Sequence, residues 1–389
     1  MKTLTLKPGE DRRIRRGHLW IFSNEIADSL KNYTPGENVT ILDARGKPVG
    51  SGIVNPNGLI ACRLYCRKGG VELNLEVIRQ LIDHAWQRRV RMGYGKVCRV
   101  VHGEADSLPG VVIDRYQDVF VIQLNSIGFA LRSPLVIEAL GSLFQVKTII
   151  EANDSPARKL EGLPLSREYH GEKPVEVLWY KDNELLFPVD LLAGQKTGAY
   201  LDQTESRRLL ASLCRTGRLL DAFCYTGAFG LIAAASGAAE VVLADSSERA
   251  LYLATESFKR NNLRKPRCEK VDLLHSDITV SDLGGVFDFI ICDPPPLIRN
   301  RNHLAEGRKK YVEVFAQALH WLKSSGLIML FSCSYHLSRE DFLEQVARAQ
   351  NKCKCTVQRL RLLQASPDHP VLVGHPETEY LHGGLFEVI

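Results

Sequence analysis

The chain has 389 residues, of which 45% are hydrophobic and 24% are charged, a composition that excludes a disordered or fibrous protein. One hydrophobic core seldom serves more than about 300 residues, so we expect two or three domains. The formal net charge is only +5, but the first 100 residues hold 18 Lys and Arg against 9 Asp and Glu. Such an excess is typical of a module that binds a polyanion, although a solvated basic face would give the same count.

The amino-terminal residues give no sign of export or of membrane insertion. Met1 to Leu4 lead directly into an alternating segment without an apolar signal region, and no later stretch has the purity of a membrane span. The ten cysteines lack the paired CxxC spacing of zinc sites and redox motifs. We therefore predict a cytoplasmic protein with no membrane partner, no bound metal and reduced, mostly buried cysteines.

Residues 1–70 are predicted to form a small β-barrel. Short β segments separated by turn sequences are expected at residues 4–6, 39–42, 49–54 and 59–65. Between the first two lies a segment, residues 12–22, that mixes guanidinium groups with aromatic rings. Such a mixture contacts phosphates and stacks on bases, so we expect Arg12, Arg13, Arg16 and Trp20 to hold RNA.

Residues 73–180 are predicted to form a separate α+β domain. An amphipathic helix begins near residue 73, where apolar residues recur at helical spacing. Another helix is expected at residues 133–144, with strands at 97–101, 111–114, 119–125 and 148–151. Polar loops at residues 161–174 separate this domain from the next.

Residues 186–389 alternate strand and helix, which indicates a parallel sheet with crossover helices. Strands are expected at residues 218–223, 240–244, 271–274, 287–292 and 327–332. Helices are expected at residues 228–236, 248–261, 304–322 and 339–350. Two further β segments, 356–363 and 381–389, complete the sheet, so this domain belongs to the α/β class.

Acidic residues at the ends of three strands predict a cofactor site. Asp221 precedes the turn Phe223 to Gly227, and Asp245 and Asp277 follow the next two strands. The pattern Gly-x-Gly-x-x-Gly of dinucleotide sites is absent. S-adenosylmethionine has no phosphate and needs acids for its amine and ribose. We assign Asp221 to its amine, Asp245 to its ribose and Asp277 to its adenine, although each acid alone could be a helix N-cap. The same loops contribute the turn residues Phe223, Tyr225, Thr226 and Gly227 and the neighbours Ser246 and Ile278.

The fourth and fifth strands end in residues suited to chemistry on a base. Asp293-Pro294-Pro295-Pro296 makes a stiff wall for a planar ring, and Cys333 follows the next strand. Carbon 5 of a pyrimidine becomes nucleophilic only after addition at carbon 6, and a cysteine thiolate can make that adduct. The activator of the Cys333 thiol is not identified by the sequence.

Over essentially its full length, the chain resembles the PUA-domain 23S rRNA (cytosine-5)-methyltransferase family. The resembling segments are Arg16 to Ser23, Gly103 to Gly110 with Ile113-Asp114-Arg115, Gln195 to Gln203, Tyr225-Thr226-Gly227, Asp293-Pro294-Pro295, Phe331 to Ser334, and Asp368 to Val371. The resemblance implies a PUA-like RNA-binding domain, a central α+β domain and a class I, Rossmann-like methyltransferase domain with a seven-stranded sheet.

The resemblance also implies roles for particular residues. Cys333 would be the nucleophile and Asp293 would hold the N3/N4 edge of a flipped cytosine. Pro294 and Pro295 would contact the base. Tyr200, Asp202 and Gln203 would line the cofactor and base pocket, with Lys196 and Thr197 nearby.

One position departs from the wider RNA cytosine-5 class. Many members carry a second cysteine directly after Asp-Pro-Pro, where this chain has Pro296, so the base that removes the C5 proton is unnamed. Two alternatives stay open: methylation of a guanine nitrogen on the same fold, and a non-catalytic RNA-binding or ribosome assembly factor. RNA is the expected partner in each case, and a homodimer is compatible with the sequence.

Overall fold

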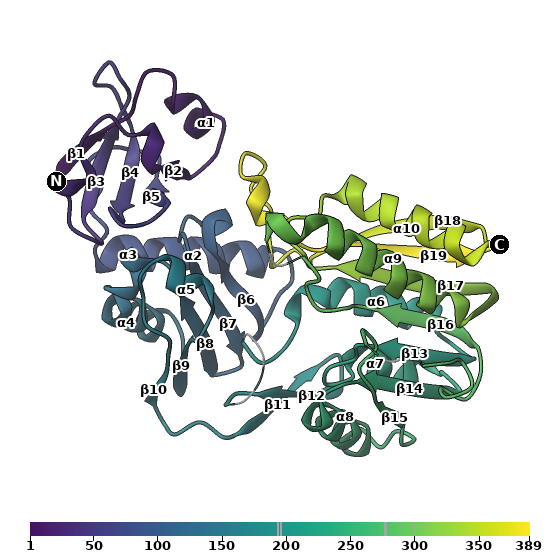
Figure 1. Ribbon diagram of the computed structural model, residues 1–389. Coiled ribbons are helices and arrows are strands. Elements are labelled where there is room, and N and C mark those ends of the chain that lie inside the picture. The colour runs from purple at the N-terminus through teal and green to yellow at the C-terminus, as the bar shows by residue number, and fades with distance from the viewer. Residues whose placement is uncertain (193, 195–196, 276–277, 299) are drawn as a thin grey trace. The chain divides into compact units, whose positions relative to one another are not determined.

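The computed structural model describes residues 1–389 except 193, 195–196, 276–277 and 299. Its internal contacts divide the chain into two compact units. Unit 1 comprises residues 1–180, 189–201 and 367–378, and unit 2 comprises residues 181–188, 202–366 and 379–389. Both units are therefore built from discontinuous segments (Figure 1). The domain boundaries near residues 70 and 180 stay predictions.

The amino-terminal part of unit 1 is a small five-stranded sheet with the order β1-β3-β4-β5-β2. A bridge between Leu6 and Ile26 connects its two edges, as expected for a barrel. The basic segment, whose structure the sequence left undefined, contributes a short helix and the edge strand β2. The bounds are β1 Lys2–Thr5, α1 Asp11–Arg15, β2 Trp20–Phe22, β3 Asn38–Leu42, β4 Pro48–Val54 and β5 Ile60–Cys66.

The rest of unit 1 is a second five-stranded sheet, of order β10-β9-β8-β7-β6, covered by α2 and α4. The expectation of loops at residues 161–174 is wrong for residues 166–171, which form β10 and pair antiparallel with β9, whereas the residues on either side of β10 are loops. The bounds are α2 Leu75–Arg91, β6 Val97–His102, β7 Val111–Tyr116, β8 Val119–Leu124, α3 Ile127–Ala130, α4 Ser133–Leu143, β9 Thr148–Asn153, α5 Ala157–Leu160 and β10 Ser166–Gly171. The polar composition of β10 suits an edge strand and leaves no alternation of apolar residues in its sequence.

A two-stranded sheet of β11 (Val177–Asp182) and β12 (Leu185–Asp190) follows, at the place where the chain passes between the units. Its connecting residues Asn183 and Glu184 both have positive φ, 45° and 69°. Two consecutive positive φ values are typical of a tight type I′ hairpin turn.

Unit 2 contains the predicted seven-stranded sheet, which is confirmed with the order β15-β14-β13-β16-β17-β19-β18. The first five strands are parallel, and β19 is antiparallel to both of its neighbours. The strands are β13 Arg218–Ala222, β14 Glu240–Asp245, β15 Arg267–Lys270, β16 Phe287–Cys292, β17 Leu322–Ser332, β18 Val357–Gln364 and β19 His382–Val388.

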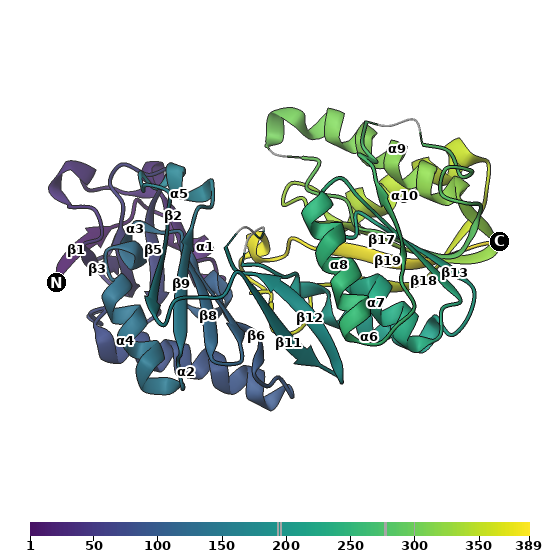
Figure 2. The ribbon, with the colours of Figure 1, turned by 90° about the horizontal axis from the view of Figure 1, so that it is seen from below.

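Helices cover both faces of this sheet, with α9 and α10 on one face and α6, α7 and α8 on the other (Figures 1 and 2). The main core lies between the sheet and the α9–α10 pair. The bounds are α6 Thr204–Leu213, α7 Ala228–Ser236, α8 Glu248–Arg260, α9 Leu304–His320 and α10 Arg339–Cys353. In the described part of the chain, no helix is long and apolar enough to span a membrane.

One expectation for unit 2 needs correction, and one helix was not predicted. The strand expected at residues 271–274 is instead β15 at Arg267–Lys270, because Asp272 accepts a hydrogen bond from the amide of Leu274 and turns the chain there. Helix α6 was not predicted at all. It lies directly before β13 and contributes a buried arginine to the site described below.

Candidate functional site

Three carboxylates meet at the carboxyl edge of the sheet in unit 2. Asp221 lies in β13, Asp245 ends β14, and Asp293 follows β16, and β13 pairs with both of the other strands. Burial, and then the charges of Asp293 and Asp245, raise the pKa of Asp221 well above its ordinary value. A site that disfavours the charge of its own carboxylates in this way is stabilised by a bound cation.

The turn after β13 is shaped by its own backbone bonds. Phe223 and Tyr225 have positive φ, 61° and 48°, a strained conformation for residues with side chains. The amide of Tyr225 donates to Asp245 at 2.9 Å, and the amide of Gly230 in α7 donates to Asp221 at 2.9 Å. The strained turn is therefore held in place by Asp245 and Asp221. We call these two carboxylates, together with Asp293, the acidic edge.

Two glycines at the start of α7 allow close packing. A Cβ at Gly227 would lie 2.9 Å from the Cβ of Ala254 in α8. A Cβ at Gly230 would lie 2.4 Å from Leu243 in β14. Both positions thus allow α7 to pack closely against its neighbours, and Gly227 also needs its positive φ of 70°.

The polar groups at this edge fit S-adenosylmethionine. Gln203 is buried, and its amide nitrogen donates to Asp293 at 2.9 Å. Its side-chain oxygen is buried without a hydrogen-bond partner, so an acceptor is available for a ligand's N–H or O–H donor. Three carboxylates and an unsatisfied acceptor suit the ammonium, sulfonium and hydroxyl groups of this cofactor, whereas they would repel a pyrophosphate.

Cys333 lies beside the Asp293 loop. It directly follows β17, the parallel neighbour of β16, and it is half-buried. Its Sγ lies 3.7 Å from the carbonyl oxygen of Pro294, toward which the thiol donates. The ends of β16 and β17 therefore lie side by side as expected from the strand order, while the approach of the sulfur to the Asp293 carboxylate and the catalytic roles of both residues stay predictions.

The remaining residues that are predicted to bind the cofactor or the base differ in burial. Pro294 is buried, Pro295 and Ser246 are exposed, Thr226 is buried, and Ile278 is half-buried against the main core. Asp277 and Lys196 lie outside the described residues. Tyr200 is half-buried and belongs to unit 1.

Thr197 differs from expectation. It is buried inside unit 1, where its hydroxyl donates to the carboxylate of Asp114. Arg99 donates to the same carboxylate, at 2.7 and 2.8 Å. The described partners of Thr197 are thus structural ones, and its hydroxyl is occupied by an internal hydrogen bond.

The four residues of the basic segment that are predicted to hold RNA differ in their internal partners. One guanidinium nitrogen of Arg13, Nη2, donates to both carboxylate oxygens of Glu25 at 2.7 and 2.9 Å, and the Trp20 indole donates to Glu104 at 2.7 Å, so both residues have internal partners. Arg12 and Arg16 are exposed on and just after α1. The internal partners of Arg13 and Trp20 help to shape the barrel surface, and RNA contact by all four residues stays a prediction.

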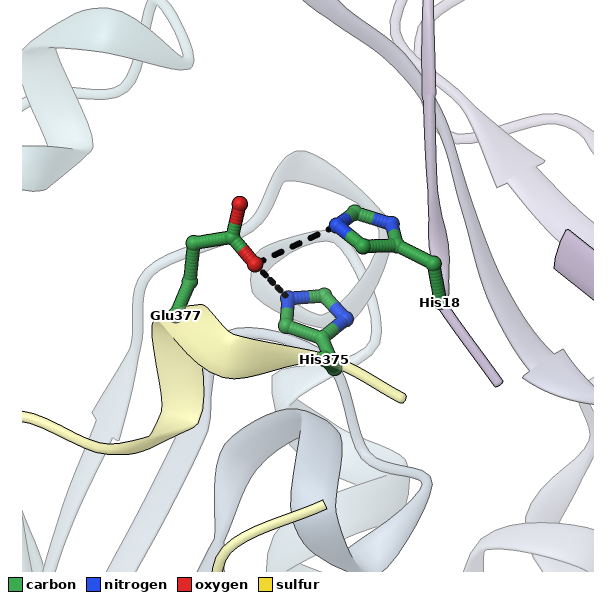
Figure 3. A group of neighbouring side chains, drawn as sticks. All are labelled: His18, His375 and Glu377. Carbon is green, nitrogen blue, oxygen red and sulfur yellow. Dashed lines mark hydrogen bonds and ion pairs between the residues drawn. The ribbon is translucent and has the colours of Figure 1, made fainter. Parts of the chain in front are cut away.

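A second group of titratable side chains, the histidine cluster, lies in unit 1 (Figure 3). The ligand atoms of His18, His375 and Glu377 lie within 4.8 Å of one another, close enough to consider a metal ion. However, the two rings are stacked, with centroids 4.1 Å apart and planes at 15°, so their in-plane lone pairs run parallel rather than converging. This geometry disfavours a shared metal.

Backbone amides orient both rings of the cluster. The Nδ1 atoms of His18 and His375 accept from the backbone amides of Trp20 and Leu19, at 3.0 and 3.2 Å. A neutral His375 therefore carries its proton on Nε2, 3.7 Å from Glu377. The Nε2 of His18 lies between Glu377 at 3.2 Å and the Arg13 guanidinium at 3.3 Å. We interpret the cluster as a set of polar contacts that holds residues 367–378 against the barrel.

Two functional contacts were missed by the sequence analysis. Arg207, buried on α6, attracts the charge of Asp221 and so opposes the rise of its pKa. Tyr380 donates to Asp202 at 2.6 Å, which fixes the residue before Gln203. The amphipathic spacing in residues 204–213 could have revealed α6, but no sequence signal connects Tyr380 with Asp202, because 178 residues separate them.

Comparison with known proteins agrees with this geometry. Residues 4–67 match the PUA-like domain family, and residues 198–359 match the methyltransferase small domain family. Over 386 residues, the chain is 32% identical to "Ribosomal RNA large subunit methyltransferase I" of Serratia proteamaculans and 31% identical to the protein of that name from Cronobacter sakazakii. Each alignment covers 98% of both chains.

The fold is also found among solved structures. A proposed SAM-dependent methyltransferase from Streptococcus mutans superposes with a TM-score of 0.84 at 21% identity, with 100% of both chains covered. The fold and the acidic edge define an S-adenosylmethionine-dependent methyltransferase with an amino-terminal PUA-like domain. Within that class, the chain belongs to the ribosomal RNA large subunit methyltransferase I family.

Proposed function

We propose that this S-adenosylmethionine-dependent methyltransferase of ribosomal RNA transfers its methyl group to carbon 5 of a cytosine in the large-subunit RNA, through a covalent Cys333 adduct. The observation that carries the proposal is the position of Cys333, half-buried and 3.7 Å from the carbonyl oxygen of Pro294. The relatives' names supply the substrate class, ribosomal RNA of the large subunit.

In this proposal the chain's own residues prepare the base. The Cys333 thiolate adds to carbon 6 and moves the electron pair of the C5–C6 double bond onto carbon 5. S-adenosylmethionine supplies the electrophilic methyl group. Loss of the C5 proton then expels the sulfur and restores the double bond. Asp293, oriented by Gln203, accepts a hydrogen bond from the N4 amine.

Cofactor binding is assigned to the acidic edge. Asp221 faces the ammonium of the methionine part, and Asp245 takes the ribose hydroxyls while it holds the turn at Tyr225. Asp277, outside the described residues, is proposed for the adenine amine. The exposed Arg12 and Arg16, together with the amino-terminal excess of basic residues, are proposed to contact RNA phosphates.

The decisive experiment traps the covalent intermediate. Enzyme and cofactor are incubated with rRNA that contains 5-fluorocytidine, whose fluorine cannot leave as a proton does, and the complex is digested for mass spectrometry. We expect an RNA adduct on the peptide that contains Cys333. The Cys333→Ser variant should form no adduct and lose turnover by several orders of magnitude, because a hydroxyl is a far weaker nucleophile than a thiolate.

Cys355→Ser is a matched control, since Cys355 is also half-buried in unit 2 but follows α10. It should form the adduct and turn over normally. Normal turnover by Cys333→Ser, or a methylated guanine in the product nucleosides, would overturn the proposal.

A further inference from the structure

A pair of buried hydroxyls lies beneath the proposed nucleophile. Tyr311 of α9 and Ser334, the residue after Cys333, are both fully buried, and their oxygens are 2.8 Å apart. A buried hydroxyl is destabilising without a partner, so this bond is expected to be formed continuously in the folded protein.

Ser334 also connects two strand ends. Its hydroxyl oxygen accepts from the backbone amide of Ile298 at 3.2 Å, and Ile298 belongs to the loop that begins with Asp293 and Pro294. The contact between Cys333 Sγ and the Pro294 carbonyl joins the same two loops. The loop after β16 and the loop after β17 are thus joined at two points, one of which includes the proposed nucleophile.

Helix α9 supports this connection from below. Gly307 lies one turn before Tyr311, and a Cβ there would lie 2.4 Å from Ile298 and 2.7 Å from the carbonyl oxygen of Leu297. The backbone of α9 therefore contacts the loop directly. This contact sets the position of Tyr311 relative to the loop, and the hydrogen bond between Tyr311 and Ser334 sets the position of Ser334.

The Tyr311 phenol is suited to a permanent structural bond rather than to proton transfer. Burial, and then the charge of a nearby Cys333 thiolate, raise the pKa of Tyr311. The phenol consequently stays protonated at neutral pH and always has a hydrogen to donate.

We propose that Tyr311 and Ser334 are positioning residues, which set the separation between the Cys333 sulfur and the Asp293–Pro294 loop and thereby place carbon 6 of the cytosine for attack. The inference rests on the proposed function. Neither residue touches the base, and both act through the two loops. Attack requires reacting atoms within about 3.5 Å, and a misplacement of about 1 Å can lower a rate about 100-fold.

The test removes one hydroxyl at a time from the full-length enzyme. Tyr311→Phe and Ser334→Ala are compared with Tyr65→Phe, which deletes an equally buried phenol that donates to the Val71 carbonyl in unit 1. We expect kcat and the rate of 5-fluorocytidine adduct formation to fall about 10- to 100-fold in the first two variants. KM for S-adenosylmethionine should be unchanged. Tyr65→Phe should retain both rates.

Two further measurements separate positioning from simple destabilisation. The rate of Cys333 alkylation by iodoacetamide is followed against pH, and its profile should move in Tyr311→Phe but not in Tyr65→Phe. Ser334→Thr keeps the hydroxyl and should recover part of the lost rate. If Ser334→Ala does not fold, Gly307→Ala displaces the same loop without removing a hydroxyl and should lower kcat selectively.

The outcomes distinguish the two proposals. If Tyr311→Phe and Tyr65→Phe show the same adduct rate and the same alkylation profile, the positioning role is wrong while the Cys333 adduct stands. If the wild-type enzyme itself forms no adduct, the proposed reaction is wrong, whatever these variants do.

Discussion

At the residue scale, opposing interactions act on the ionisation of Asp221. Its carboxylate is 2% exposed and accepts the Gly230 amide, which favours the ionised form, but burial and the charges of Asp293 and Asp245 favour the proton more strongly. Because the pKa is raised, the folded apo protein binds this proton more tightly than the unfolded chain does. Its stabilising effect is therefore full at low pH and is lost as the pH rises toward the raised pKa.

A cationic cofactor should reverse this balance. We expect binding of S-adenosylmethionine to favour ionised Asp221 and to release a proton, measurable by calorimetry in buffers of different ionisation enthalpy. Asp221→Asn keeps an acceptor for Gly230 but removes the charge. It should abolish the proton release and weaken binding about 10- to 100-fold, the loss of a charged hydrogen bond, without lowering the melting temperature.

Asp288→Asn is the control for this prediction, because Asp288 lies in β16 at the opposite edge of the sheet and pairs with Lys323. It should bind the cofactor normally and lose some stability. Unchanged proton release in Asp221→Asn would show that another group titrates.

At the element scale, α7 contacts both the proposed cofactor turn and the sheet, so its packing affects the shape of that turn. Its first turn is held to β13 by the bond from Gly230 to Asp221, and the same glycine packs against Leu243 and Val241 of β14. The helix can approach the sheet closely only because residue 230 lacks a side chain.

Gly230→Ala should therefore destabilise unit 2, although alanine favours helices. Its Cβ would lie 2.4 Å from Leu243, and overpacking of this kind costs about 1–3 kcal/mol. Gly141→Ala in α4 meets nothing within 4 Å and should stabilise the protein by about 0.5–1 kcal/mol. Thermal unfolding should show a lower melting temperature for Gly230→Ala and a higher one for Gly141→Ala. Changes of the same sign in both variants would contradict the packing argument.

At the scale of the whole molecule, two segments return from the methyltransferase half of the sequence to unit 1. Residues 189–201 are held through Thr197 and Asp114, and residues 367–378 through Asp368, which accepts from the Arg99 amide at 2.9 Å. Arg99 contacts both carboxylates, Asp114 through its guanidinium and Asp368 through its backbone amide, so one residue helps to hold both segments. The histidine cluster secures the second segment against the barrel.

This arrangement predicts acid sensitivity of unit 1. Burial, and then the charge of Arg13, lower the pKa of His18, while burial and the charge of His18 lower that of His375 to about 4. Arg63 acts in the same direction on His375, and Glu104 and Glu377 oppose it. An unfolded histidine titrates near about 6.5, so the contribution of the neutral pair is full above that pH and is lost as the pH falls toward 4.

Hydrogen exchange at the Leu19 amide, which donates to His375, reports this loss directly. Its protection should decrease between about pH 6.5 and 4. His375→Gln should weaken protection at pH 7 and flatten the pH dependence, whereas His84→Gln, at an exposed position of α2, should change neither. A flat profile in the wild-type protein would contradict the assignment.

The sequence by itself determined the class of fold and the chemistry of the strand ends. Period and turn signals placed the seven strands and four of the five helices of unit 2 approximately, with the exception of the shifted β15, because burial of one helix face or of a whole parallel strand leaves a local pattern. The position of Cys333 after the fifth strand suggested the nucleophile, and the resemblance to a known family supported that role and placed Gln203 at the pocket.

Only the tertiary structure decided which polar groups meet. The pairing of Asp202 with Tyr380, the internal partners of Arg13 and Trp20, and the bridge from Tyr311 to Ser334 join residues that no local pattern relates. Hydrogen bonds of this kind depend on side chains brought within 3 Å by the fold, and a hydroxyl or guanidinium has the same local signature whether it will face solvent or a buried carboxylate.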